Sequence, residues 1–126
     1  MVDLNAPYDP LAVVTDQPLV RVPLALEALR AYRSEQKLAL LPGIDPTAER
    51  ERLSRVLEVL IDELLAGLEG SPSKLWVMKR FQRALKAVQY EDTEGREHFG
   101  MELERVMDLV GIESSDGLLN FYLVGI

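Results

Sequence analysis

The chain has 126 residues, the size of one ordinary domain, and its 48% hydrophobic and 28% charged residues are typical of a folded globular protein. It has no cysteine, which excludes disulfides, a thiolate nucleophile and a cysteine-ligated zinc site. Its net charge of −7 disfavours nucleic acid and anionic lipid as partners and favours basic proteins.

The beginning of the chain lacks the basic residues and the unbroken apolar stretch of a signal peptide, because Asp3, Asp9 and Asp16 all precede the first base, Arg21. No uncharged apolar run approaches the roughly 20 residues that a membrane-spanning helix needs. We therefore expect a cytoplasmic protein with no membrane association.

Residues 1–23 contain four prolines, which fix their own φ and bias the preceding residue toward extended geometry. We predict an extended N-terminal arm that packs across the rest of the molecule, because its many apolar side chains would otherwise lie in water. Asp9 followed by Pro10 predicts one helical turn, ending near Thr15, within this arm.

Two amphipathic helices are predicted after the arm. Apolar residues recur at three and four residues over 24–38, and a proline-glycine pair follows this pattern and ends it. Asp45 predicts the N-cap of the second helix, which starts at Pro46, buries a stripe of leucine, isoleucine and valine, and ends near Gly67.

A third helix is predicted from a cap at Ser71 to about Tyr90. A fourth begins at Asp92-Thr93 and ends at Gly111, where the next residue is expected to fold back as in a left-handed cap. One residue of the Ser114-Ser115 pair predicts the cap of a short fifth helix, which is apolar nearly all round its axis.

These elements predict an all-α fold, a compact bundle of four to five helices with an extended proline-rich N-terminal arm, in a single helical domain over residues 1–126. The polar face of the third helix is basic, whereas residues 91–116 hold nine acids. Four bases on one helix could follow a phosphate backbone, but we expect the acidic fourth helix to neutralise them, so nucleic acid is not the predicted partner. Whether the basic helix 74–90 is paired internally or exposed stays open.

The fourth helix places Glu94, His98 and Glu102 in line at four-residue spacing, and His98 is the single histidine of the chain. Two carboxylates and an imidazole on one helix face could bind a metal ion. A solvated helix face is the favoured interpretation, because these acids lie away from the apolar stripe. We therefore expect no metal and no cofactor.

Two segments, Ser34–Lys37 and Ser71–Lys74, match the Ser-x-x-Lys pattern in which a lysine activates a serine nucleophile. Two matches in so short a chain, without the companion motifs, show how unspecific the pattern is, and a helix cap explains Ser71. The sequence has no nucleophile elbow, Walker loop, dinucleotide fingerprint or calcium loop. We therefore predict that the protein is not an enzyme.

Protein binding is the favoured function, with a basic protein as the predicted partner. The acidic density of residues 91–116 would speed association with a partner of opposite charge. Tryptophan and methionine are favoured in protein interfaces. The candidate partner-binding residues are therefore Trp76, Glu97, Met101, Glu102, Glu104 and Asp108.

The segment RVMDLVGIESSDGLLN, residues 105–120, resembles the closing motif of a bacterial family of small helical proteins described only as a domain of unknown function. The resemblance covers this C-terminal segment alone. It implies a bacterial helical domain and carries no activity or catalytic residue.

Three functional hypotheses follow from these observations. The first is a small acidic binding module, in its most concrete form an immunity or antitoxin-like protein. The second is a homo-oligomeric structural or regulatory module, motivated by the final helix, whose apolar residues exceed what one small core needs. The third is a carboxylate-based metal binder or enzyme that uses Glu94, His98 and Glu102.

Overall fold

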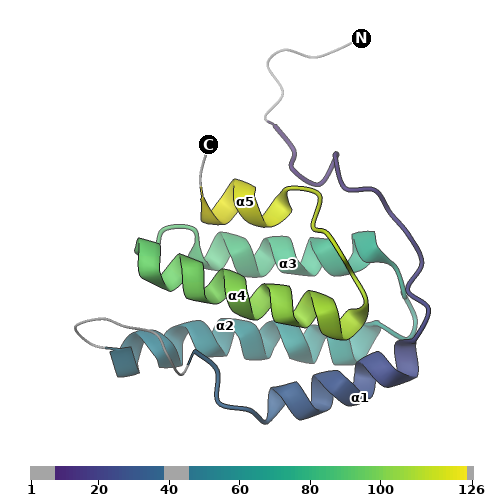
Figure 1. Cartoon of the computed structure of the whole chain (residues 1–126), viewed down its shortest axis with the longest axis horizontal. Helices are drawn as coiled ribbons and strands as arrows, with labels where there is room; N and C mark the ends of the chain where they lie inside the picture. Colours follow the sequence, from purple (N-terminus) through teal and green to yellow (C-terminus); the bar gives the residue numbers. More distant parts are fainter. Residues whose placement is uncertain (1–7, 39–45, 125–126) are drawn as a thin grey trace.

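The computed structural model describes residues 8–38 and 46–124 (Figure 1). The helices are α1 (Val22–Arg33), α2 (Pro46–Gly67), α3 (Lys74–Val88), α4 (Thr93–Val110) and α5 (Leu118–Leu123). No β-strand occurs in this part of the chain, so the predicted all-α bundle is confirmed. The N-cap predicted for α2, Asp45, lies outside the described residues.

Helices α2 and α3 lie side by side and α4 lies in front of them, with α1 along one edge of the bundle and α5 along the other (Figure 1). Their apolar faces enclose one core, in which the rings of Tyr32, Phe81 and Phe99 are buried. Burying rings of this size supplies much of the stability of a small domain. Within the described residues, no helix has both the length and the apolar character that crossing a bilayer requires.

Helix α1 covers Val22–Arg33, whereas the sequence predicted a helix over 24–38. It begins earlier because Pro23 occupies its first turn, where the fixed φ of proline suits a helix. It ends earlier because the buried ammonium group of Lys37 folds back and donates to three carbonyl oxygens within residues 32–35, at 2.9–3.1 Å. These bonds satisfy carbonyl groups that a longer helix would have paired.

The N-cap of α3 is Ser73 and not the predicted Ser71, because Ser73 Oγ accepts from the backbone N–H of Trp76 at 3.1 Å. The cause is the N-terminal arm. Two backbone hydrogen bonds of 2.8 and 2.9 Å join residues 17–19 to residues 72–74 in an isolated antiparallel bridge. Extended pairing with the arm therefore delays the start of the helix.

The predicted ends of α4 are confirmed. At its beginning, Asp92 Oδ1 accepts from the backbone N–H of Gly95 at 2.7 Å. At its end, Gly111 has a φ of 82° and the N–H of Ile112 donates to the carbonyl oxygen of Met107 at 2.9 Å. This geometry is the left-handed cap that the glycine predicted.

Helix α5 has its N-cap at Gly117, with a φ of 89°, and not at either predicted serine. Ser115 still supports the first turn, because its Oγ accepts from the backbone N–H of Leu119 at 3.3 Å. The described part of the arm reaches α5 as well, since the ring of Tyr8 lies 5.3 Å from that of Phe121. The apolar surface of α5 is thus covered by α3, α4 and the arm, which weakens the reason for expecting an oligomer through this helix.

The predicted helical turn of the arm is a hydrogen-bonded turn over residues 10–13. The Asp9 carboxylate accepts from the backbone N–H of Leu11 at 3.0 Å, and the Asp9 carbonyl accepts from Ala12. An aspartate before a proline therefore starts the turn as expected. A second turn follows, in which the backbone N–H of Val14 donates to the carbonyl oxygen of Leu11 at 3.1 Å.

Candidate protein-binding surface

One face of α4 is open to solvent. The helix buries Phe99 and Leu103 against the bundle, and residues three or four apart on an α-helix share a face. On the opposite face, the exposed residues with this spacing include Glu97, Met101, Glu104 and Asp108, and Met101 is 60% exposed. We call these four residues the acidic stripe. The structure thus brings together four of the six predicted partner-binding residues.

The carboxylates of the acidic stripe have no ion-pair partner among the described residues. The nearby base Arg105 turns away from them, because its guanidinium lies 2.6 Å from the carboxylate of Glu35 and above the ring of Tyr32. Helix α4 has no base in its last turn, where the helix dipole is negative. The dipole and the carboxylates therefore add to one negative surface.

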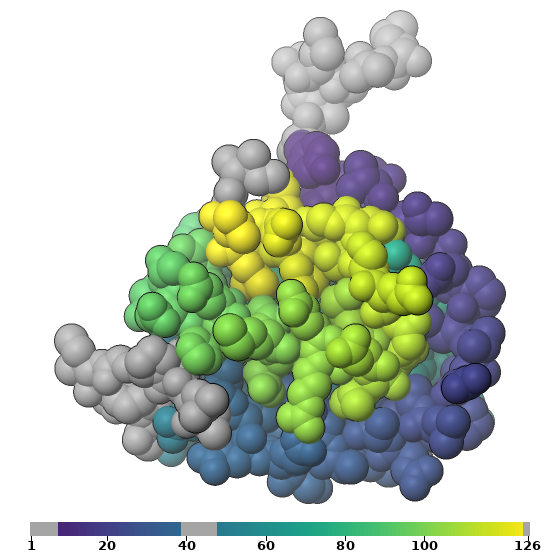
Figure 2. Space-filling model, in the orientation of Figure 1, coloured from purple at the N-terminus to yellow at the C-terminus, as the bar shows by residue number. Residues whose placement is uncertain are grey.

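This negative surface continues beyond the end of α4. The turn at Gly111 brings residues 112–117 back beside the last turn of the helix, and a polar hollow forms there whose lining includes Glu104, Asp108 and Glu113. Figure 2 shows α4 in green and the segment after it in yellow-green across the front of the molecule. Glu113 belongs to the acidic run of residues 91–116, but its place beside the acidic stripe could not be predicted from the sequence, because it depends on the chain reversal.

Glu102 lies outside the acidic stripe, half-buried beside α1. Its Oε2 accepts a hydrogen bond of 2.5 Å from the hydroxyl of Tyr32, so the carboxylate is engaged within the fold. In the other two predicted metal ligands, Nε2 of His98 lies 4.0 Å from Oε2 of Glu94. In the part of the chain that the structure describes, no three histidine, aspartate or glutamate side chains are grouped to hold a metal ion.

Trp76 lies in the first turn of α3 and not on the acidic stripe. Its indole packs against Gly67 at the end of α2, and the guanidinium of Arg80 stacks 4.3 Å from the ring centroid. The ring is therefore half-buried, with one face on the bundle and the other under a cation. This tryptophan joins α2 to α3 and is a separate feature from the acidic surface.

Replacing Gly67 with alanine should displace Trp76, because an added Cβ would lie 2.3 Å from the indole ring. We expect the clash to outweigh the higher helix propensity of alanine and to lower the free energy of unfolding by about 1 kcal/mol. Tryptophan emission should shift to longer wavelength as the ring becomes more hydrated. The matched control is Gly70→Ala, where the nearest atom to the added Cβ is 3.9 Å away. Unchanged emission in Gly67→Ala would contradict the packing described.

The basic face of α3 is not neutralised by α4 within the described residues. Arg83 forms an ion pair of 2.8 Å with Glu63 of α2, and Arg80 stacks on Trp76. Lys79 and Lys86 are exposed and form no ion pair with a described residue. The expected neutralisation by the acidic helix therefore fails, and the chain presents separate acidic and basic surfaces.

A family model described as "Domain of unknown function (DUF4844)" matches residues 21–126. This range is much longer than residues 105–120, on which the resemblance to a family of unknown function rests, and it begins where the arm meets α1. No curated protein matches the chain, and no solved structure matches it.

Proposed function

The chain belongs to the DUF4844 family of unknown function, and we propose that it is a non-enzymatic protein-binding module that docks a basic protein on its acidic stripe. The observation that carries the proposal is a row of three carboxylates that form no ion pair with a described residue and that surround one exposed methionine. Met101 would provide the apolar contact at the centre of the interface, and the carboxylates would surround it.

The position of these acids adds support. Asp108 lies in the last turn of α4, where carboxylates are repelled by the negative end of the helix dipole. A local feature that lowers stability is more often found at a functional surface than elsewhere in a fold. Negative potential on one face also speeds the encounter with a positively charged partner and orients it.

In its most concrete form, the partner is a basic enzyme that this small acidic chain holds inactive in a bacterial cytoplasm, as immunity and antitoxin proteins do. An interface centred on one helix suits this role, because opposite charges can give rapid association while a few apolar contacts hold the complex.

The test is native affinity purification at low salt, identification of the co-eluting protein by mass spectrometry, and measurement of its dissociation constant. The variant E97K/E104K/D108K should bind at least about tenfold more weakly, since three interface charges are reversed. The control E27K/E51K/E69K reverses three exposed acids outside the acidic stripe, so both variants carry the same net charge.

We expect the control variant to keep nearly all of the affinity and to retain the salt dependence of the native chain. Equal weakening in both variants would show that net charge, and not the acidic stripe, attracts the partner. Purification of the free chain alone at low salt would contradict the proposed function.

A further inference from the structure

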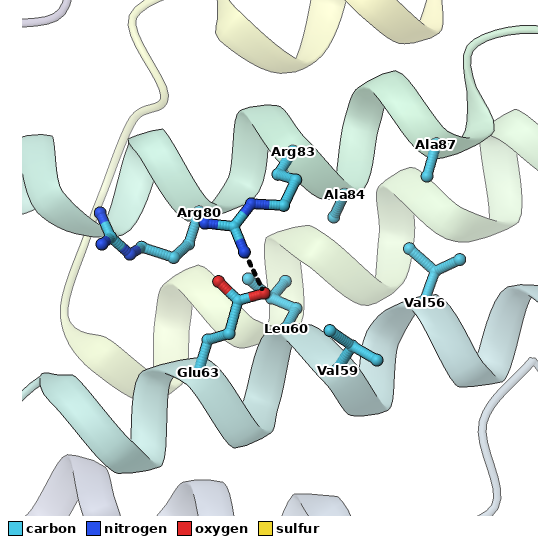
Figure 3. Close-up of a pocket in the computed structure, with 8 residues that line it drawn as sticks. All are labelled: Val56, Val59, Leu60, Glu63, Arg80, Arg83, Ala84 and Ala87. Atoms are coloured by element: carbon cyan, nitrogen blue, oxygen red, sulfur yellow. Dashed lines mark ion pairs between the residues drawn. The ribbon is translucent and has the colours of Figure 1, made fainter.

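A shallow apolar groove lies between α2 and α3 (Figure 3). It is lined by Val56, Val59 and Leu60 of α2 and by Ala84 and Ala87 of α3. The alanines leave space opposite the branched side chains of α2, and Val59 is 57% exposed. Covering an exposed aliphatic side chain is favourable, so these residues form a surface that gains free energy from contact with another apolar side chain.

One end of this groove is positively charged. Arg83 and Glu63 form their ion pair there, and Arg80 lies beside them (Figure 3). Arg80 stacks on Trp76 and has no carboxylate partner among the described residues. Because Arg83 and Glu63 neutralise each other, Arg80 leaves this end of the groove with a net positive charge. The groove therefore suits an acidic helix that carries one exposed apolar side chain.

The chain itself carries such a helix in α4. Met101 is exposed at the centre of the acidic stripe, with carboxylates on both sides. Glu97 precedes Met101 by four residues, as Arg80 precedes Ala84, so each pair spans about 6 Å along its helix axis. If Met101 lies beside Ala84 and the helices run parallel, Glu97 therefore meets Arg80.

We propose that the α2–α3 groove binds the acidic stripe of a second copy of this chain. In the parallel arrangement the carboxylate of Glu97 in the second copy lies beside Arg80, which has no carboxylate partner among the described residues. The charge complementarity of two surfaces of the same chain identifies the occupant.

The two surfaces lie on opposite sides of the bundle. Helix α4 is in front of α2 and α3 in Figure 1 and behind them in Figure 3, where the groove faces the reader. A contact between different surfaces is head-to-tail, so each added copy leaves a groove and an acidic stripe free, and association continues beyond a pair. A basic protein on the acidic stripe competes with this contact, but self-association does not depend on such a partner.

Light scattering on the purified chain tests the proposal. At low salt the average mass should exceed the 14.2 kDa of one chain, rise with concentration and fall as salt is added. Val59→Glu places a carboxylate in the groove and Met101→Lys places a cation in the acidic stripe, so each variant alone should be a monomer. The control is Leu24→Glu on α1, where the native side chain is 60% exposed, and it should associate like the native chain.

Mixing the variants gives the sharpest result. Val59→Glu keeps an intact acidic stripe and Met101→Lys keeps an intact groove, so the mixture should form one-to-one pairs and nothing larger. If Val59→Glu loses its helical circular dichroism, Ala87→Glu replaces it at the other exposed apolar position of the groove. A native chain that stays monomeric at low salt, or a mixture that stays monomeric, would overturn the proposal.

Partner binding and self-association can be tested separately with the same variant. Val59→Glu should retain full affinity for the basic partner, because its acidic stripe is unchanged. Loss of self-association with unchanged partner binding supports the groove contact, whereas equal loss of both in Val59→Glu would contradict it.

Discussion

Replacing Asp116 with asparagine is expected to lower the free energy of unfolding by about 3 kcal/mol. Asp116 Oδ2 lies 2.7 Å from the ammonium group of Lys74, whose side chain is only 6% exposed, and also accepts from the backbone N–H of Thr15 at 2.9 Å. Without the carboxylate, a buried cation loses its counter-charge. Asparagine tolerates the left-handed φ of 54° at this position, so the substitution removes charge without adding backbone strain. Urea denaturation measures the change.

A double-mutant cycle separates the ion pair from other effects of the substitution. Lys74→Met in the Asp116→Asn background should recover part of the lost stability, because replacing both partners of a buried ion pair costs much less than removing one. The two residues also join three parts of the fold, since Lys74 begins α3, Thr15 belongs to the arm and Asp116 precedes α5. Additive effects of the two substitutions would contradict this account.

The same contact makes stability depend on acid pH. The hydrogen bond from Lys74, then that from the Thr15 amide, holds the pKa of Asp116 below its ordinary value. A carboxyl with a lowered folded-state pKa binds its proton more readily in the unfolded chain. Its stabilisation is therefore fully present above about pH 4 and is lost as the pH falls further. Asp116→Asn should lose less stability than the native chain over that interval.

The ends of the helices show which features of the fold are local. Asp92 and Gly111 act on backbone groups within a few residues of themselves, so both ends of α4 could be predicted. The start of α3 could not, because it depends on backbone pairing with residues 17–19, far away in the sequence. The end of α1 depends on Lys37, whose burial against carbonyl groups follows from the packing of the whole bundle.

The candidate surface also contains some features that could be predicted from the sequence and others that could not. The exposed residues of the acidic stripe follow from helical spacing alone, since each step of three or four residues returns to one face. Glu102 directly follows Met101 and therefore points about 100° away round the helix, toward Tyr32. The α2–α3 groove needed knowledge of which helices are neighbours, because neither Val59 nor Ala87 is distinctive in the sequence of its own helix.

Replacing Tyr32 with phenylalanine is expected to lower the free energy of unfolding by about 2 kcal/mol at neutral pH. The ring of Tyr32 is 1% exposed and its hydroxyl donates to the carboxylate of Glu102 at 2.5 Å. Phenylalanine fills nearly the same volume, so the loss reports the charge-assisted hydrogen bond and not a cavity. The matched control is Tyr90→Phe, at a side chain that is 93% exposed, and it should leave stability unchanged.

Alkaline pH provides a second measurement on the same substitution. Burial, and next the hydrogen bond to Glu102, raise the pKa of Tyr32 above its ordinary value. Because the unfolded chain then releases this proton more readily, the stabilisation is present below about pH 10 and is lost as the pH rises further. Tyr32→Phe has no such proton to lose, so its stability should fall less steeply than that of the native chain between about pH 10 and 11.5. Parallel stability curves for the two chains over this interval would show that the Tyr32 hydroxyl is not held in its protonated form by Glu102 and the surrounding core.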